Sequence, residues 1–377
     1  MPKISEFIEQ YTKTNTRRIY KTAIRAYFAF IYGIERDRKT PLETYEALAE
    51  RYLLEQRDYS QDVIGFAVSF GNSPPKTAQT YVAAVKEFLI FSEIELREMD
   101  LRKIKKKMPK GGAATVEKIL DVETVRTILY HCSLQMRALI LLLVSSGMRI
   151  GEVLTLDLKD IDTDGEIGYI TVRGSTGDGG GAKGGNQRYT FCSAEAAEAI
   201  REWKKKREAY LIESENRGKG IGQIKNMNDT RLFPLSSTTV SNAWLVALQT
   251  AGLVSRDTVT NRLQIHIHMT RKFFSSQLRL VVPTDIVEGL MGHSGYLSDA
   301  YRRYTRKQVE EFYRKGEPYV TIQLTDEIRE LRTTTEKKMQ AHSEILENVI
   351  QRSMNMERRM LEFEARCNLM ELAEREE

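Results

Sequence analysis

Hydrophobic positions recur at helical spacing through the first hundred residues. Within residues 4–34 the apolar positions, such as Ile19 and Ala23, lie three or four residues apart, so they share one face of a helix. Residues 77–94 repeat this pattern, and a proline pair directly before them marks a helix start. Neither segment alternates as a strand would. The pattern therefore predicts a helical domain over residues 1–100.

A second helical region begins near residue 120 and leads into a nearly all-apolar run at 136–144. This run predicts a buried helix that continues through Arg149 and Glu152. At i, i+3 spacing these two charged residues would share a helix face. A buried arginine is costly unless it is paired, so it usually has a function. A structural ion pair between the two is the alternative interpretation.

Two short segments after this helix have the composition of strands. Residues 166–174 and 187–193 are rich in aromatic and β-branched side chains, and a glycine-rich stretch at 175–186 joins them as a long hairpin tip. Further helices are expected at 193–211 and 237–253. The order of elements predicts a mainly α fold with a small antiparallel β-sheet, of the α+β class.

The end of the chain has a different periodicity. From Leu324 onward apolar residues follow a 4-3 pattern with a slip near Val349, which predicts a helix of roughly 50 residues, about 75 Å long. We favour a self-associating coiled coil, and packing back onto the body is the rival interpretation. The predicted organisation is a helical domain at 1–100, a basic linker at 101–114, a second domain at 115–319 and a helical tail at 320–377.

Charge is unevenly distributed along the chain. Its net value is +5, but residues 1–319 carry 48 basic residues against 39 acidic ones, whereas residues 320–377 carry 9 against 13. A basic body indicates a polyanionic partner, and an inert basic surface is the alternative. The linker supplies the predicted phosphate contacts, which are Arg102, Lys103, Lys105, Lys106, Lys107 and Lys110.

Cysteine spacing and hydropathy argue against a cysteine metal site and against a membrane protein. The cysteines Cys132, Cys192 and Cys367 lie far apart without metal-ligand spacing. No apolar run reaches about 18 residues, and the first residues lack a signal-peptide pattern. We therefore expect a protein of the reducing cytoplasm, with no membrane contact, no metal and no cofactor.

The second domain carries, in order, side chains that suit chemistry on a phosphodiester. Two arginines can grip non-bridging phosphate oxygens with fork geometry, and a lysine on a mobile tip can protonate a leaving oxygen. A histidine can move a proton near neutral pH, and a tyrosine activated by cations can attack phosphorus. The candidates are Arg149, Lys183 in the hairpin tip, His268 and Arg271 at His-x-x-Arg spacing, His293, Tyr301 and Tyr304.

These segments resemble the tyrosine recombinases, the integrase family that cuts DNA through a phosphotyrosine. The stretches "SSGMRIGEVLTLDLKDID", "HMTRKFF" and "LMGHSG" are similar to the boxes of that family, in the same order, across residues 115–315. The helical region at 1–100 resembles its core-binding domain, which binds DNA. The stretch "MGHSGYLSDAYRRYT" looks closest to integrases of archaeal plasmids and viruses.

The resemblance implies a role for each cationic residue of the second domain. Arg149 and Arg271 would clamp the scissile phosphate, and Lys183 would be the general acid for the leaving 5′ hydroxyl. His268 would act in acid/base transfer, while His293 would hydrogen-bond the phosphate.

The resemblance also implies a nucleophile and a supporting carboxylate. Tyr301 would attack the phosphorus. Glu152 would orient the side chains of the site without contacting the phosphate itself. Tyr301 lies eight residues after His293, whereas many relatives have nine. Tyr304, at eleven residues, is the alternative nucleophile.

The expected function is site-specific DNA recombination, by an integrase of a mobile element. Four protomers would act on double-stranded attachment sites, without ATP, because the phosphotyrosine ester conserves the bond energy. A type IB topoisomerase-like enzyme that relaxes DNA and a catalytically inactive DNA-binding protein are the two alternatives.

Overall fold

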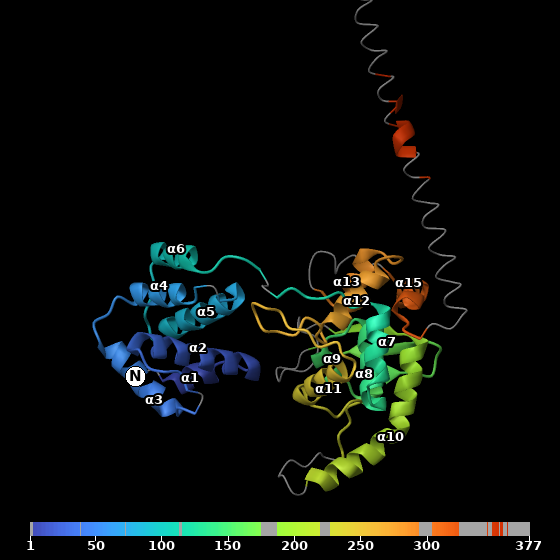
Figure 1. Ribbon diagram of the computed structural model, residues 1–377, viewed down its shortest axis with the longest axis horizontal. Coiled ribbons are helices and arrows are strands. Elements are labelled where there is room, and N and C mark those ends of the chain that lie inside the picture. Colours follow the sequence, from blue (N-terminus) through green and yellow to red (C-terminus); the bar gives the residue numbers. More distant parts are fainter. Residues whose placement is uncertain are drawn as a thin grey trace, which may run out of the picture.

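The computed structural model describes residues 3–37, 39–71, 73–112, 115–174, 187–218, 227–293 and 304–323, together with 345, 349–353, 355–356 and 360. The helices before residue 108 form one body, and the elements after residue 115 form another (Figure 1). Lys183, Tyr301 and most of the tail lie outside the described residues, so the coiled coil stays a prediction. Among the described helices, none is both long and apolar enough to cross a membrane.

The first body is a set of helices around an aromatic core. Rings of Phe28 and Phe88 meet edge to face at 5.8 Å between centroids, and the buried hydroxyls of Tyr27 and Tyr52 lie 2.5 Å apart in a hydrogen bond. Such edge-to-face pairs add to the stabilisation from buried area. The helices are α1 (Ile4–Glu9), α2 (Thr14–Tyr32), α3 (Leu42–Leu54), α4 (Tyr59–Ser69), α5 (Pro75–Phe91) and α6 (Glu98–Lys107).

The predicted linker at 101–114 is helical over its first part. Helix α6 covers it as far as Lys107, and Ile104, 1% exposed, packs into the aromatic core of the first body. The buried Asp100 accepts hydrogen bonds from Arg97 at 2.9 Å and Lys103 at 3.2 Å. The helical body therefore extends beyond the predicted boundary at residue 100, because one apolar residue within a basic run docks the helix.

The second body is mainly helical with a three-stranded antiparallel sheet, as predicted. The sheet order is β1-β2-β3, and its register sets Tyr169 opposite Phe191 and Val172 opposite Arg188. The elements are α7 (Val122–Tyr130), α8 (Leu134–Ser146), α9 (Ile150–Leu154), β1 (Ile161–Asp162), β2 (Gly168–Val172), β3 (Arg188–Cys192), α10 (Ala194–Gly218), α11 (Ser237–Thr250), α12 (Met269–Leu278), α13 (Thr284–Met291) and α15 (Arg306–Val320).

Helix α8 is the centre of the second body (Figure 1). It packs against α10, α12 and strand β3, and its residues from 135 to 146 are nearly all buried. The prediction that this helix continues through Arg149 is wrong. Gly147 takes a left-handed conformation with φ of +63° and ends the helix, as glycine commonly does.

The turn at Gly147 also requires glycine for steric reasons. A Cβ atom there would lie 2.3 Å from Cδ1 of Phe274, a buried ring of α12. The close approach brings α12 against the end of α8. The glycine of the first sequence box is therefore needed both for the backbone turn and for helix packing.

We expect Gly147→Ala to destabilise the second body by about 3 kcal/mol or more, since it combines a positive φ with overpacking. Gly252→Ala is the matched control, because Gly252 has a φ of +68° but nothing within 4 Å of its Cβ position. That control should lose only about 1–2 kcal/mol. Chemical denaturation of both variants compares them, and equal losses would contradict the steric argument.

Candidate active site

The C-terminal end of α8 is a buried helix end whose carbonyl groups are bound by side chains. A helix leaves its last four carbonyls without backbone partners. Here the Tyr313 hydroxyl donates to the Ser145 carbonyl at 2.7 Å, and Thr190 donates to the Ser146 carbonyl at 2.9 Å. Arg271 donates from Nη1 to the Gly147 carbonyl. Side chains from α15, β3 and α12 thus meet at the turn that precedes Arg149.

Arg149 and Glu152 form one half of a capping box, in which only the Glu152 side chain accepts, and they do not lie on one face of a continuous helix. Arg149 is the N-cap of the short helix α9, with extended backbone at φ −78° and ψ 147°. The Glu152 carboxylate accepts from the Arg149 backbone N–H at 2.8 Å and from its Nη1 at 3.1 Å. Since i, i+3 is also the spacing of a capping box, the sequence pattern fits both arrangements.

Arg188 is a residue of this site that the sequence analysis missed. Its guanidinium forms a fork with both oxygens of Glu152, at 3.1 and 2.8 Å, and both side chains are almost completely buried. Burial alone would raise the pKa of Glu152, but the hydrogen bonds and charge of Arg188 hold it below its usual value. Glu152 is therefore a buried carboxylate shared by two arginines.

Arg271, the arginine of the His-x-x-Arg box, is buried beside this group. It lies on α12, is 3% exposed, and donates from Nη2 to the Met291 carbonyl at 2.7 Å. Burial, and next the nearby charge of Arg149, lower the pKa of Arg271 to about 9. We call Arg149, Arg188 and Arg271 the cationic cluster. It holds three guanidinium groups around one carboxylate, so it is ready to accept an anion.

Both predicted histidines border the cationic cluster. Burial lowers the pKa of His268, and the charge of Arg271 lowers it further. The pKa of His293 is lowered by the same two causes in the same order. The Nδ1 atom of His293 contacts the Glu288 carboxylate; because a carboxylate only accepts, Nδ1 carries the hydrogen and Nε2 of the neutral ring is an acceptor.

The two candidate tyrosines differ in what the structure describes. Tyr304 is half-buried, and its ring meets that of Phe312 on α15 edge to face at 5.8 Å. It packs against the hydrophobic core of this region. Tyr301 lies outside the described residues, as does Lys183, so neither is placed relative to the cationic cluster.

The predicted DNA-contact residues lie mostly on α6. Arg102 pairs with Glu98 at 2.6 Å, and Lys103 pairs with Asp100 at 3.2 Å. The remaining four are exposed, namely Lys105, Lys106, Lys107 and Lys110. The helix therefore presents a basic, solvent-facing surface on the first body.

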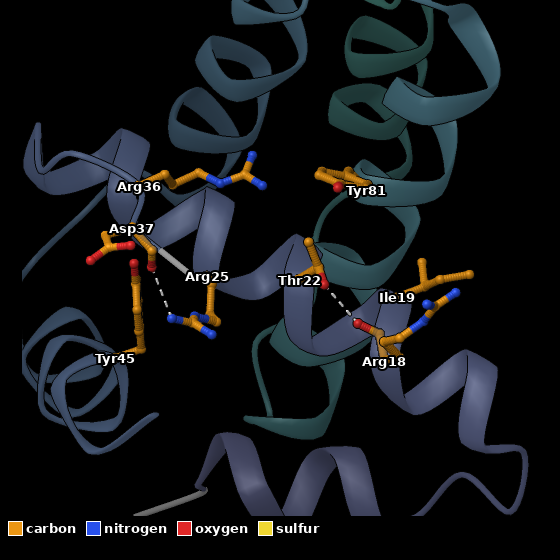
Figure 2. A pocket seen from close by; sticks show the side chains of 8 residues that line it. All are labelled: Arg18, Ile19, Thr22, Arg25, Arg36, Asp37, Tyr45 and Tyr81. Atoms are coloured by element: carbon orange, nitrogen blue, oxygen red, sulfur yellow. Dashed lines mark hydrogen bonds between the residues drawn. The ribbon is translucent and has the colours of Figure 1, made fainter. Parts of the chain in front are cut away.

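A basic groove on the first body was not predicted. Figure 2 shows Arg18, Arg25 and Arg36 around a hollow of about 720 Å³ between α2, the loop after it, α3 and α5. Arg25 is used within the fold: it donates to the Thr40 carbonyl and lies 4.7 Å over the Tyr45 ring. The other two arginines are exposed. Arg18 donates from Nη2 to Oδ1 of the exposed Asn15 at 3.0 Å, so Arg18 and Arg36 are the solvent-exposed cations of the groove.

No three His, Cys, Asp or Glu side chains group as metal ligands within the described ranges. The cationic cluster itself offers donors and no acceptor pair for a metal, apart from the occupied Glu152. The chemistry that these residues favour is recognition of an oxyanion.

Comparisons with known proteins place the chain in a family. The model of the phage integrase family matches residues 114–311, which contain the cationic cluster. Tyrosine recombinase XerC of Myxococcus xanthus is 28% identical over 228 residues, covering 57% of this chain and 65% of the relative. Tyrosine recombinase XerA of Saccharolobus solfataricus is 26% identical over 195 residues, covering 52% and 59%.

Among solved structures, the Tn1549 transposon integrase in complex with circular intermediate DNA is 14% identical, with a TM-score of 0.45 over 77% of this chain and 99% of that one. This chain spans less than two thirds of the length of either curated relative. The family match covers more than half of the chain and includes all the boxes found in the sequence. The chain belongs to the phage integrase family.

Proposed function

We propose that the protein is a site-specific DNA recombinase, the integrase of a mobile element, that cuts and rejoins DNA through a 3′-phosphotyrosine. The observation that carries this is the hydrogen bond from Arg271 of α12 to the Gly147 carbonyl, two residues before Arg149 at the start of α9, which brings two arginines from separate elements to one turn. Two such groups can hold the two non-bridging oxygens of one phosphodiester. Closeness to archaeal plasmid or viral integrases remains a prediction.

The proposed cleavage step is a transesterification at one phosphorus. The Tyr301 oxygen attacks the phosphorus and gives its proton to His268, and the bond to the 5′ oxygen breaks. Lys183 protonates that leaving oxygen. The two clamping arginines stabilise the charge that grows on the equatorial oxygens, where fixed charges are most effective. A 5′ hydroxyl of a partner strand then reverses the step, so no ATP is consumed.

The protonation states of the free protein support these roles. With a lowered pKa, His268 is neutral near pH 7 and able to accept a proton. His293 can donate from Nε2 to a phosphate oxygen only as an imidazolium, since its Nδ1 faces Glu288. A bound phosphate favours that charged form. Glu152 stays ionised and orients Arg149.

Tyr301 is our proposed nucleophile, and the packing of Tyr304 supports this choice. The ring of Tyr304 is engaged with Phe312 and the surrounding core. A nucleophile needs a hydroxyl that can reach a phosphate in the site. In the proposal the other partners are double-stranded attachment sites and three further protomers, and the tail joins protomers as a coiled coil.

We expect Tyr301→Phe to abolish covalent trapping on a nicked suicide substrate, because the attacking oxygen is removed. Tyr304→Phe should still trap DNA. Denaturing gels with labelled DNA measure both, and mass spectrometry of the DNA-linked peptide identifies the residue. Trapping lost only in Tyr304→Phe would reverse the assignment. No trapping by the wild type would favour a DNA-binding protein, and relaxation without strand exchange would favour a topoisomerase-like enzyme.

The basic groove should contact backbone phosphates of the DNA. We expect the double variant Arg18→Ala and Arg36→Ala to weaken DNA binding and to lower the slope of log affinity against log salt by about 2, roughly one for each lost contact. Fluorescence anisotropy over a salt series measures this. Lys205→Ala is the control, an exposed lysine of α10 paired with Glu202. An unchanged slope in the double variant would exclude the groove.

Folding stability should fall as the pH drops below about 6.5, in part because of His268. Its folded pKa lies below the unfolded value of about 6.5, so the unfolded chain binds more protons in that window. We expect His268→Asn to show a shallower loss of unfolding free energy between about pH 6.5 and 5. Replacement of His131, an exposed histidine after α7, is the control. Parallel curves for wild type and His268→Asn would contradict the prediction.

A further inference from the structure

Arg188 is a buried arginine to which neither the sequence nor the proposed cleavage step gives a role. It is the first residue of β3, and its side chain is 7% exposed. All its guanidinium nitrogens are engaged. Nη1 and Nη2 donate to the two oxygens of Glu152, and Nε donates to the Leu290 carbonyl at 3.1 Å. Hydrogen bonds to Glu152 and to the Leu290 carbonyl therefore fix the position of the Arg188 guanidinium.

Because Arg188 forms a fork with Glu152, it limits the hydrogen bonds that this carboxylate can accept from Arg149. Arg188 occupies both oxygens in the geometry that arginine and carboxylate prefer. Arg149 is left with a single guanidinium bond, from Nη1 at 3.1 Å. Its Nε and Nη2 donate to no residue that the structure describes, and its side chain is 25% exposed against 2% for Glu152. Within the described part of the chain, Arg149 thus keeps two donor nitrogens for a ligand.

The third bond of Arg188 reaches the segment that carries His293. Leu290 lies in the last turn of α13, directly before the turn at Gly292. A Cβ atom on Gly292 would lie 2.6 Å from Cδ and Nε of Arg188, so glycine is needed for the arginine to pass. Arg188 therefore ties the turn before His293 to the carboxylate beside Arg149.

We propose that Arg188 is a positioning residue that reserves Arg149 for the substrate phosphate by occupying Glu152. Without it, the free carboxylate oxygens would draw the Arg149 guanidinium into a fork of its own. The clamp would then lose one arginine although Arg149 is still present. This inference rests on the proposed function, because the phosphate is that of the DNA to be cut.

The test compares rates of covalent trapping at saturating DNA for the full chain. Arg188→Met should trap about 100-fold more slowly, the cost of a misplaced group in the site, while DNA affinity is unchanged. Combining it with Glu152→Gln should restore the rate to within about tenfold of the wild type. The neutral amide no longer captures Arg149, and a residue needed only for folding would show no such rescue.

Two further variants test the proposal even if Arg188→Met does not fold. Arg188→Lys keeps the charge but cannot form the fork, so it should trap about tenfold more slowly even if Arg188→Met does not fold. Arg231→Met is the control for loss of an arginine that also binds a carboxylate and a backbone carbonyl: Arg231 pairs with Asp229 and donates to the Leu235 carbonyl, although its side chain is 39% exposed. It should trap at the wild-type rate.

The outcomes separate the two proposals. If the wild-type protein fails to trap DNA, the proposed function is contradicted. If the wild type traps, three results would overturn the role of Arg188: Arg188→Lys at the wild-type rate, a double variant no faster than Arg188→Met, or an equal loss in Arg231→Met.

Discussion

The buried C-terminal end of α8 is the constraint on which the rest of the second body depends. Carbonyl groups in an apolar interior must find donors, since an unpaired one costs about as much as a lost hydrogen bond. Tyr313, Thr190 and Arg271 supply those donors at three successive carbonyls. Each donor comes from a different element, so satisfying the helix end also assembles α15, β3 and α12 around the turn that leads to Arg149.

That same requirement explains how positive charge comes to be concentrated in the interior. Arg271 is held at a helix end, where a cation is favoured by the carbonyl dipoles, yet burial and Arg149 still lower its pKa to about 9. The charge of Glu152 can neutralise only one guanidinium, although two arginines, Arg149 and Arg188, both pair with it. The free protein therefore carries unbalanced charge that a phosphate would relieve. A site organised before the substrate arrives is the usual basis of electrostatic catalysis.

Local patterns were sufficient for most helices and for the β2–β3 pair, and long-range contacts decided what the local patterns left open. Periodicity predicted the helical first body and the β2–β3 pair, whereas the i, i+3 spacing of Arg149 and Glu152 suited a helix face and a capping box equally. Only the positive φ of Gly147 against Phe274 decides between them. Arg188 was not predicted as a site residue because its partners, Glu152 and Leu290, lie far away in sequence.

Two helices extend beyond the boundaries expected for them, for related reasons. Composition predicted a linker from residue 101, but Ile104 docks α6 onto the first body. The helix expected to end at residue 211 continues as α10 to Gly218. The choice between Tyr301 and Tyr304 depended on counting from His293, and the structure adds only the packing of Tyr304.

The most direct measurement of the central claim is the position of a bound tetrahedral oxyanion. Crystals of the protein soaked in tungstate would locate the metal by its anomalous scattering. We expect one strong peak within hydrogen-bond reach of both Arg149 and Arg271, with Arg188 still bound to Glu152. A peak on only one of the two arginines, or none in the cationic cluster, would contradict it.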